Sequence, residues 1–146
     1  MPQFGRPSTD ASIGGYTDQV GGTTSIYGTL DESVADDADY IQSALAPASA
    51  PYVTKLTTLE DPVSSSNHIV RYRYQKSTAG GAQINLTVEL RQGYVSEASQ
   101  GTLIAQWVHT NIPATWTQQA QTLSGAQADA SSDYTSLYLR FVATQV

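Results

Sequence analysis

The chain has 146 residues, 40% of them hydrophobic, which is enough for one domain with a single core. It contains no cysteine, so disulfides and thiolate chemistry are excluded, and its net charge of -6 argues against nucleic acid as a partner. Charged residues make up 14% of the chain, and Ser, Thr, Gln, Asn and Gly supply most of the polar surface, a balance typical of extracellular β proteins, virion proteins and adhesive modules.

The first twelve residues have two prolines, a glycine and no hydrophobic periodicity. We interpret residues 1–12 as an extended N-terminal arm that orders only against a neighbour, with a frayed terminus as the alternative. Phe4, Arg6 and Pro7 are then the candidate partner contacts of the arm. Residues 13–146 are expected to form a single β-sandwich domain.

Acidic residues concentrate in the first half, where residues 1–66 hold nine acids against Arg6 and Lys55. Short strands are predicted at 26–30, 40–43 and 52–59, separated by segments rich in Gly, Pro and Ser. The segment between the first two, DESVADDAD, holds five acids in nine residues.

The carboxylates of Asp36, Asp37 and Asp39 are the candidate metal ligands, because calcium prefers oxygen ligands on loops between strands. Their spacing does not match the Asp-x-Asp-x-Asp-Gly calcium loop. We therefore favour a solvated acidic loop over a calcium site, and no cofactor is expected.

The most regular stretch is residues 82–91, in which aliphatic and polar residues alternate strictly; the aliphatic ones are Ile84, Leu86, Val88 and Leu90. A period of two predicts a central strand of an antiparallel sheet, with one face on a core and the other toward water. Residues 68–76 alternate in the same way. Because a break at 77–81 with two glycines leads directly into the central strand, we expect the two strands to form a hairpin.

Further strands are predicted at 102–110, 114–123 and 137–142, with one helical turn within 124–133. About eight to nine short strands at this spacing predict an all-β fold, an antiparallel β-sandwich that is jelly-roll-like. The chain contains neither a run of about 18 apolar residues, which a membrane span needs, nor the apolar segment of a signal peptide.

Catalytic motifs are absent from the sequence. His68 and His109 fall on separate predicted strands, outside any nucleophile, metalloprotease or phosphate-loop motif. Glu89, Glu97 and Asp129 are carboxylates of the type that glycoside hydrolysis uses, but any acidic surface offers as much. We therefore expect no enzymatic activity.

Two groups of side chains are candidates for binding. The aromatic residues either form a platform for sugar rings or fill the core, and the shared face of Tyr72 and Tyr74 with Val70 favours the core; the group comprises Tyr72, Tyr74, Trp107, Trp116, Tyr134 and Tyr138. Three arginines either pair with acids of a neighbouring subunit or face solvent: Arg71, Arg73 and Arg140.

Four segments carry a resemblance to a known class of protein: RPSTDASIGGYT, LDESVADDADYIQS, HIVRYRYQKSTAGGAQINLTVELRQG and IAQWVHTNIPATWTQQAQTLSGAQADASSDYTSLYLRFVA. Together they resemble small β-sandwich proteins encoded among the structural genes of tailed bacteriophages and prophages. The resemblance implies a jelly-roll subunit that decorates the head or sits in the head-to-tail or tail region. It implies no catalytic residues.

The expected function is therefore that of a non-enzymatic virion structural protein, a capsid decoration or minor head or tail subunit present in many copies. Its partners would be other virion proteins and copies of itself, with no nucleic acid and no membrane. It would be made in the host cytoplasm and reside in the virion. The alternative is a carbohydrate-binding jelly-roll module that takes part in host-surface attachment.

Overall fold

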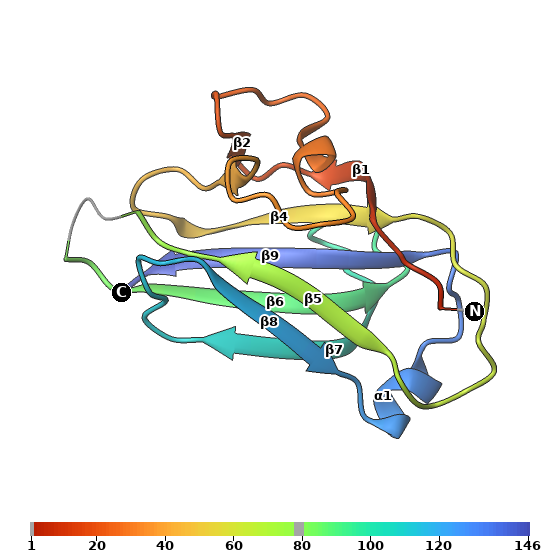
Figure 1. Cartoon of the computed structure of the whole chain (residues 1–146). Coiled ribbons are helices and arrows are strands. Elements are labelled where there is room, and N and C mark those ends of the chain that lie inside the picture. Colours follow the sequence, from red (N-terminus) through yellow and green to blue (C-terminus); the bar gives the residue numbers. More distant parts are fainter. Residues whose placement is uncertain (1, 78–80) are drawn as a thin grey trace.

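The protein is an all-β antiparallel sandwich (Figure 1), as the sequence predicts, in a computed structural model that describes residues 2–77 and 81–146. The described residues form nine strands, within the expected eight to nine. The elements in chain order are β1 (Pro7–Ser12), β2 (Thr17–Asp18), the 3-10 helix η1 (Ile26–Thr29), β3 (Ile41–Gln42), β4 (Ala48–Leu56), β5 (Ile69–Tyr74), β6 (Ile84–Gln92), β7 (Thr102–His109), β8 (Thr117–Thr122), α1 (Gly125–Ala130) and β9 (Leu137–Gln145).

The larger layer is a five-stranded sheet in the order β1-β4-β9-β6-β7. The predicted central strand is β6, which pairs with β9 on one side and β7 on the other. Its alternation places Leu86, Val88 and Leu90 on the buried face, with Val88 fully buried. The prediction that this strand lies inside an antiparallel sheet with its aliphatic residues toward the core is confirmed.

The inner face of this sheet is apolar across four strands. Directly paired residues share a face, and one such row runs across β4, β9, β6 and β7: Tyr52, Phe141, Val88 and Trp107. Two separate segments cover the face. One is the two-stranded β5–β8 sheet, and the other is residues 17–45, here called the excursion, whose Ile26 and Ile41 pack near Tyr52.

The predicted hairpin between residues 68–76 and 82–91 is wrong. β5 pairs with β8 over its whole length, whereas β6 pairs with β7 and β9. Both strands carry one apolar face, and alternation identifies that face without identifying the neighbour. Stacking the strands across the sandwich buries both faces against each other. Residues 78–80 of the expected turn lie outside the described residues.

Residues 26–29 form the 3-10 helix η1 instead of the predicted strand. The Asp10 carboxylate of β1 accepts hydrogen bonds from the backbone N–H groups of Ile26 (2.8 Å) and Tyr27 (2.9 Å) at the start of this helix. The helical turn expected within 124–133 is confirmed as α1, which begins with a capping box formed by Ser124 and Gln127.

Truncating an inward side chain of β6 should show how much this core contributes to the free energy of unfolding. Leu90 is 4% exposed, so Leu90→Ala should lower the free energy of unfolding by about 2–5 kcal/mol through lost burial and a cavity. Val108→Ala, at a 60% exposed position on β7, should change it by less than about 0.5 kcal/mol. Chemical denaturation of both variants measures the difference, and equal effects would contradict the assignment of the core face.

Candidate functional site

Most of the predicted N-terminal arm belongs to the domain itself. Pro7–Ser12 form β1 and pair with β4, so the expectation that the arm orders only against a neighbour is wrong for these residues. Thr57 N–H donates to the carbonyl of Arg6, and the Arg6 guanidinium donates to the carbonyl of Asp31. Among the three candidate contacts of the arm, Phe4 is the one with a largely exposed side chain, at 63%.

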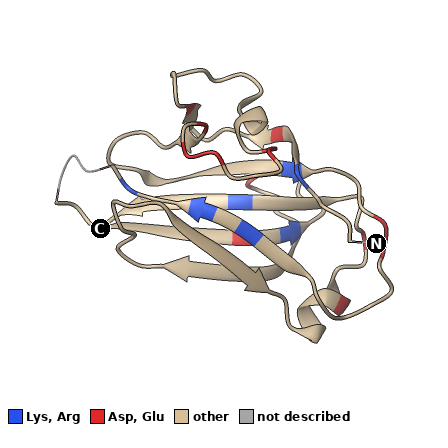
Figure 2. Cartoon of the chain, in the orientation of Figure 1, with Lys and Arg blue, Asp and Glu red and all other residues tan. Residues whose placement is uncertain are grey.

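The acidic loop lies on the excursion, which holds six of the thirteen acidic residues of the chain (Figure 2). Asp37 forms an ion pair of 2.8 Å with Arg73 of β5, and Asp36 accepts a hydrogen bond from the backbone of Ala38. Burial raises the pKa of Glu32, and the neighbouring carboxyl of Asp39 raises it further. Within residues 2–77 and 81–146, no three acidic or histidine side chains are grouped as metal ligands.

The aromatic residues of β5 lie between the layers. Tyr72 and Tyr74 are buried, and their hydroxyls contact the two ring nitrogens of His109, Nε2 at 2.8 Å and Nδ1 at 3.1 Å. The side-chain amides of Gln119 and Gln121 donate to the same hydroxyls. Burial lowers the pKa of His109. These rings therefore belong to the core, where their polar atoms bind one another.

A buried ion cluster lies on the outer face of the five-stranded sheet. Glu89 is 6% exposed and forms ion pairs with Arg91 (2.6 Å) and Arg140 (3.1 Å). Arg140 also pairs with Glu97 (2.7 Å) on the loop of residues 93–101, and the Tyr94 hydroxyl donates to Glu97. This loop folds over the sheet, so the prediction that Glu89 faces water is wrong. Arg140 pairs within its own chain.

The neighbouring part of the outer face carries no charge. One row of directly paired residues on this face consists of Pro51, Val142, Thr87 and Val108, and a second pair beside it consists of Thr144 and Asn85. We call these six residues the outer-face panel. They are half-buried, except for Val108, which is 60% exposed. A neutral, partly apolar sheet face of this kind is suited to docking against another surface.

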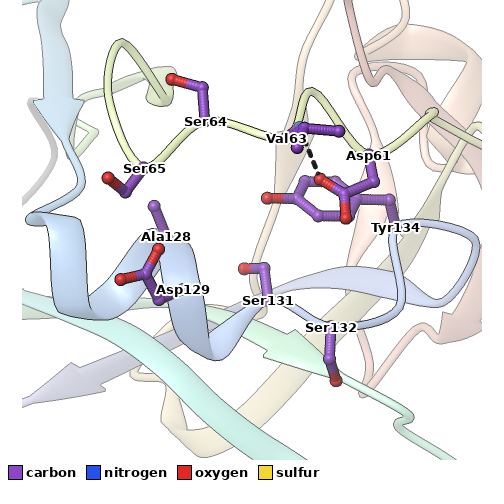
Figure 3. Close-up of a pocket in the computed structure, with 9 residues that line it drawn as sticks. All are labelled: Asp61, Val63, Ser64, Ser65, Ala128, Asp129, Ser131, Ser132 and Tyr134. Atoms are coloured by element: carbon purple, nitrogen blue, oxygen red, sulfur yellow. Dashed lines mark hydrogen bonds between the residues drawn. The ribbon is translucent and has the colours of Figure 1, made fainter.

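A polar cavity of about 460 Å³ lies between the loop after β4 and helix α1 (Figure 3). Asp61, Asp129, Ser131 and the ring of Tyr134 line it, and the Ser131 hydroxyl points into it. The Tyr134 hydroxyl contacts Nε2 of His68 at 3.1 Å. Burial raises the pKa of Tyr134, and the charges of the two aspartates add to this.

The sequence indicated neither the cavity nor the panel. The cavity joins two Ser-rich segments, within 61–65 and 128–134. In the sequence the first is part of a polar turn and the second lies largely within the predicted helical turn, and they meet only in the fold. The panel joins single residues of four strands, and their register is set by tertiary pairing.

No family model, curated protein or solved structure matches this chain. Among the described residues, no helix has the length and apolar character needed to cross a membrane.

The ion cluster should make stability depend on pH. The hydrogen-bonded Arg140 guanidinium lowers the pKa of Glu97 below its ordinary value of 4.5. The unfolded chain then takes up the proton first, so the free energy of unfolding should fall as the pH drops below 4.5 and through the folded-state pKa. Denaturant titrations between about pH 6 and pH 3 measure this fall.

Glu97→Gln should reduce the fall, because the titrating group is gone. Gln100→Ala is the matched control, since it removes a neighbour that donates to Glu97 but keeps the carboxylate and its pair with Arg140. An unchanged pH dependence in Glu97→Gln would show that this pair does not contribute to stability.

Proposed function

We propose that the protein is a non-enzymatic structural subunit of a bacteriophage particle, attached in many copies to the capsid or tail surface. Its partners are other virion proteins and neighbouring copies of itself, and it is made in the host cytoplasm before assembly. The proposal joins the resemblance of the sequence to small phage structural proteins with one observation on the fold, the outer-face panel.

The panel supports attachment because its backbone is already ordered and its residues are uncharged. Pro51, Val142, Thr87 and Val108 extend across four hydrogen-bonded strands, so they form a surface whose backbone is already ordered. A surface that is already ordered loses little conformational entropy when it binds. The adjoining ion cluster, anchored by Arg140 and Glu97, holds the 93–101 loop at the boundary of the panel.

Attachment in many copies makes a small contact sufficient. Specific stable interfaces typically bury about 1,200–2,000 Å² in total, or roughly 800 Å² on each partner. The six residues of a single panel are too few to bury that area. On a symmetric shell, lateral contacts between neighbours convert weak single contacts into stable occupancy.

The proposal predicts that the protein is present in purified particles and is depleted from them after a charge is placed on the panel. Val108→Glu should lower its abundance in particles by at least about tenfold, because an unpaired carboxylate would be buried at the contact. Val20→Glu is the control, since Val20 is 84% exposed on the excursion, away from the panel. Quantitative mass spectrometry of the particles measures both.

Absence of the wild-type chain from the particles would refute the proposed function. Equal loading of the Val108→Glu and wild-type chains would refute the role of the panel while leaving particle membership intact. Circular dichroism of each variant confirms that the sandwich is folded before assembly is scored.

Carbohydrate binding is the second candidate, and the cavity near α1 favours it. Hydroxyl and carboxylate groups of Asp61, Asp129 and Ser131 converge there beside the ring of Tyr134. Carboxylates and hydroxyls that surround an aromatic ring are suited to a polyhydroxylated ligand, and the cavity volume lies within the usual range for ligand sites.

A glycan array separates the two candidates. The binding module predicts a specific signal that Asp129→Asn and Ser131→Ala abolish and that Val20→Glu leaves unchanged. A structural subunit without sugar affinity predicts no signal above background for any of the three.

A further inference from the structure

The exposed strand edges of the sandwich are protected in different ways. Edge strand β1 contains Pro7 and two interruptions of its register with β4, and Asp10 holds η1 beside it. Edge strand β7 has a bulge opposite Leu90 and Arg91, and α1 contacts it. Proline, bulges and covering segments are the usual means by which proteins prevent an edge from pairing with another chain.

The edges of the second layer differ from each other. β5 carries Arg71 and Arg73, and the ion pair between Arg73 and Asp37 brings the acidic loop next to it. β2 and β3 are two residues long each. β8, with the sequence TQQAQT, has six residues, no charge, no proline and an unbroken register with β5.

The far edge of β8 is open in the described part of the chain, where β5 is the strand that pairs with β8. The side chains of Gln118, Ala120 and Thr122 are exposed on its outer face. The strand is about 20 Å long at the usual rise per residue. Its backbone groups along this edge are a template for a further strand.

We propose that β8 pairs with β8 of a second copy of this chain, in an antiparallel arrangement about a two-fold axis. The two β5–β8 sheets then become one continuous four-stranded sheet, with the β5 strands at its outer edges. This inference does not depend on membership of a phage particle.

The distribution of charge favours a second copy as the occupant. Each chain carries a net charge of -6, so two copies repel each other unless they meet at a neutral surface. β8 is tan along its whole length in Figure 2, whereas six of the thirteen acidic residues lie on the excursion. The β8 edge therefore lets two copies approach without opposing like charges.

The sequence of β8 is also compatible with itself. A two-fold axis perpendicular to the sheet keeps the faces of the two strands aligned, so residues of the same parity pair. With Ala120 on the axis, Gln119 lies opposite Gln121 of the second copy, and Gln118 lies opposite Thr122. Each pair is neutral and able to form hydrogen bonds, so no like charges oppose each other across the two strands.

Single cysteines test this register, because the natural chain has no cysteine that would compete. Directly opposed residues of antiparallel strands have Cα atoms about 4.5–5.5 Å apart, within the range that a disulfide spans. Ala120→Cys should therefore form a disulfide-linked dimer at least about ten times faster than Ala48→Cys, a control at an exposed position of β4. Mixing Gln118→Cys with Thr122→Cys should give the corresponding cross-link between two different chains.

Sedimentation equilibrium of the wild-type chain measures the monomer–dimer equilibrium independently. At concentrations up to about 1 mM, it detects dimers with an association free energy as weak as about -4 kcal/mol. We expect a reversible dimer, and Ala120→Lys should be monomeric because two lysines would oppose each other on the axis. A wild-type monomer throughout this range, a dimer that persists in Ala120→Lys, or cross-linking of Ala120→Cys no faster than Ala48→Cys would each overturn the proposal.

Discussion

The inner face of the five-stranded sheet is wider than a two-stranded ladder can cover, and much of the architecture follows from this constraint. Its apolar row extends from Tyr52 on β4 to Trp107 on β7. The β5–β8 sheet covers the part near β6 and β9, and the excursion covers the part near β4. The excursion therefore contributes to the core although it contains little regular structure.

The β5–β8 sheet and the excursion cover only the inner face, so the outer face of the five-stranded sheet must be covered or kept soluble by other residues. One part is covered by the 93–101 loop, which requires that Glu89 be buried with two arginine partners, since a buried carboxylate without partners would cost several kcal/mol. The remaining part, the outer-face panel, consists of uncharged residues of four strands. The same sheet thus presents a satisfied ionic cluster and a neutral docking panel on adjacent rows.

The sequence predicted those features that depend on alternation within one strand. The buried face of β6, the strand expected at 137–142 and the helical turn expected within 124–133 follow from local pattern. Partners were not predictable in the same way. Glu89 lies on the polar face of β6 in either case, so the sequence does not show that a loop covers it. The apolar face of β5 is equally compatible with pairing beside β6 in one sheet and with packing against β6 from the opposite layer.

The open edge of β8 has a physical origin in its own composition. Its half-buried side chains, Gln119 and Gln121, are polar, and they are accommodated because the hydroxyls of Tyr74 and Tyr72 accept their amide hydrogens. A further strand from the same chain would need an apolar face to extend this layer over the core, but the next residues turn into α1. The backbone edge that remains can be paired by another molecule without burying additional apolar surface, which is why an antiparallel strand of the same neutral sequence fits it.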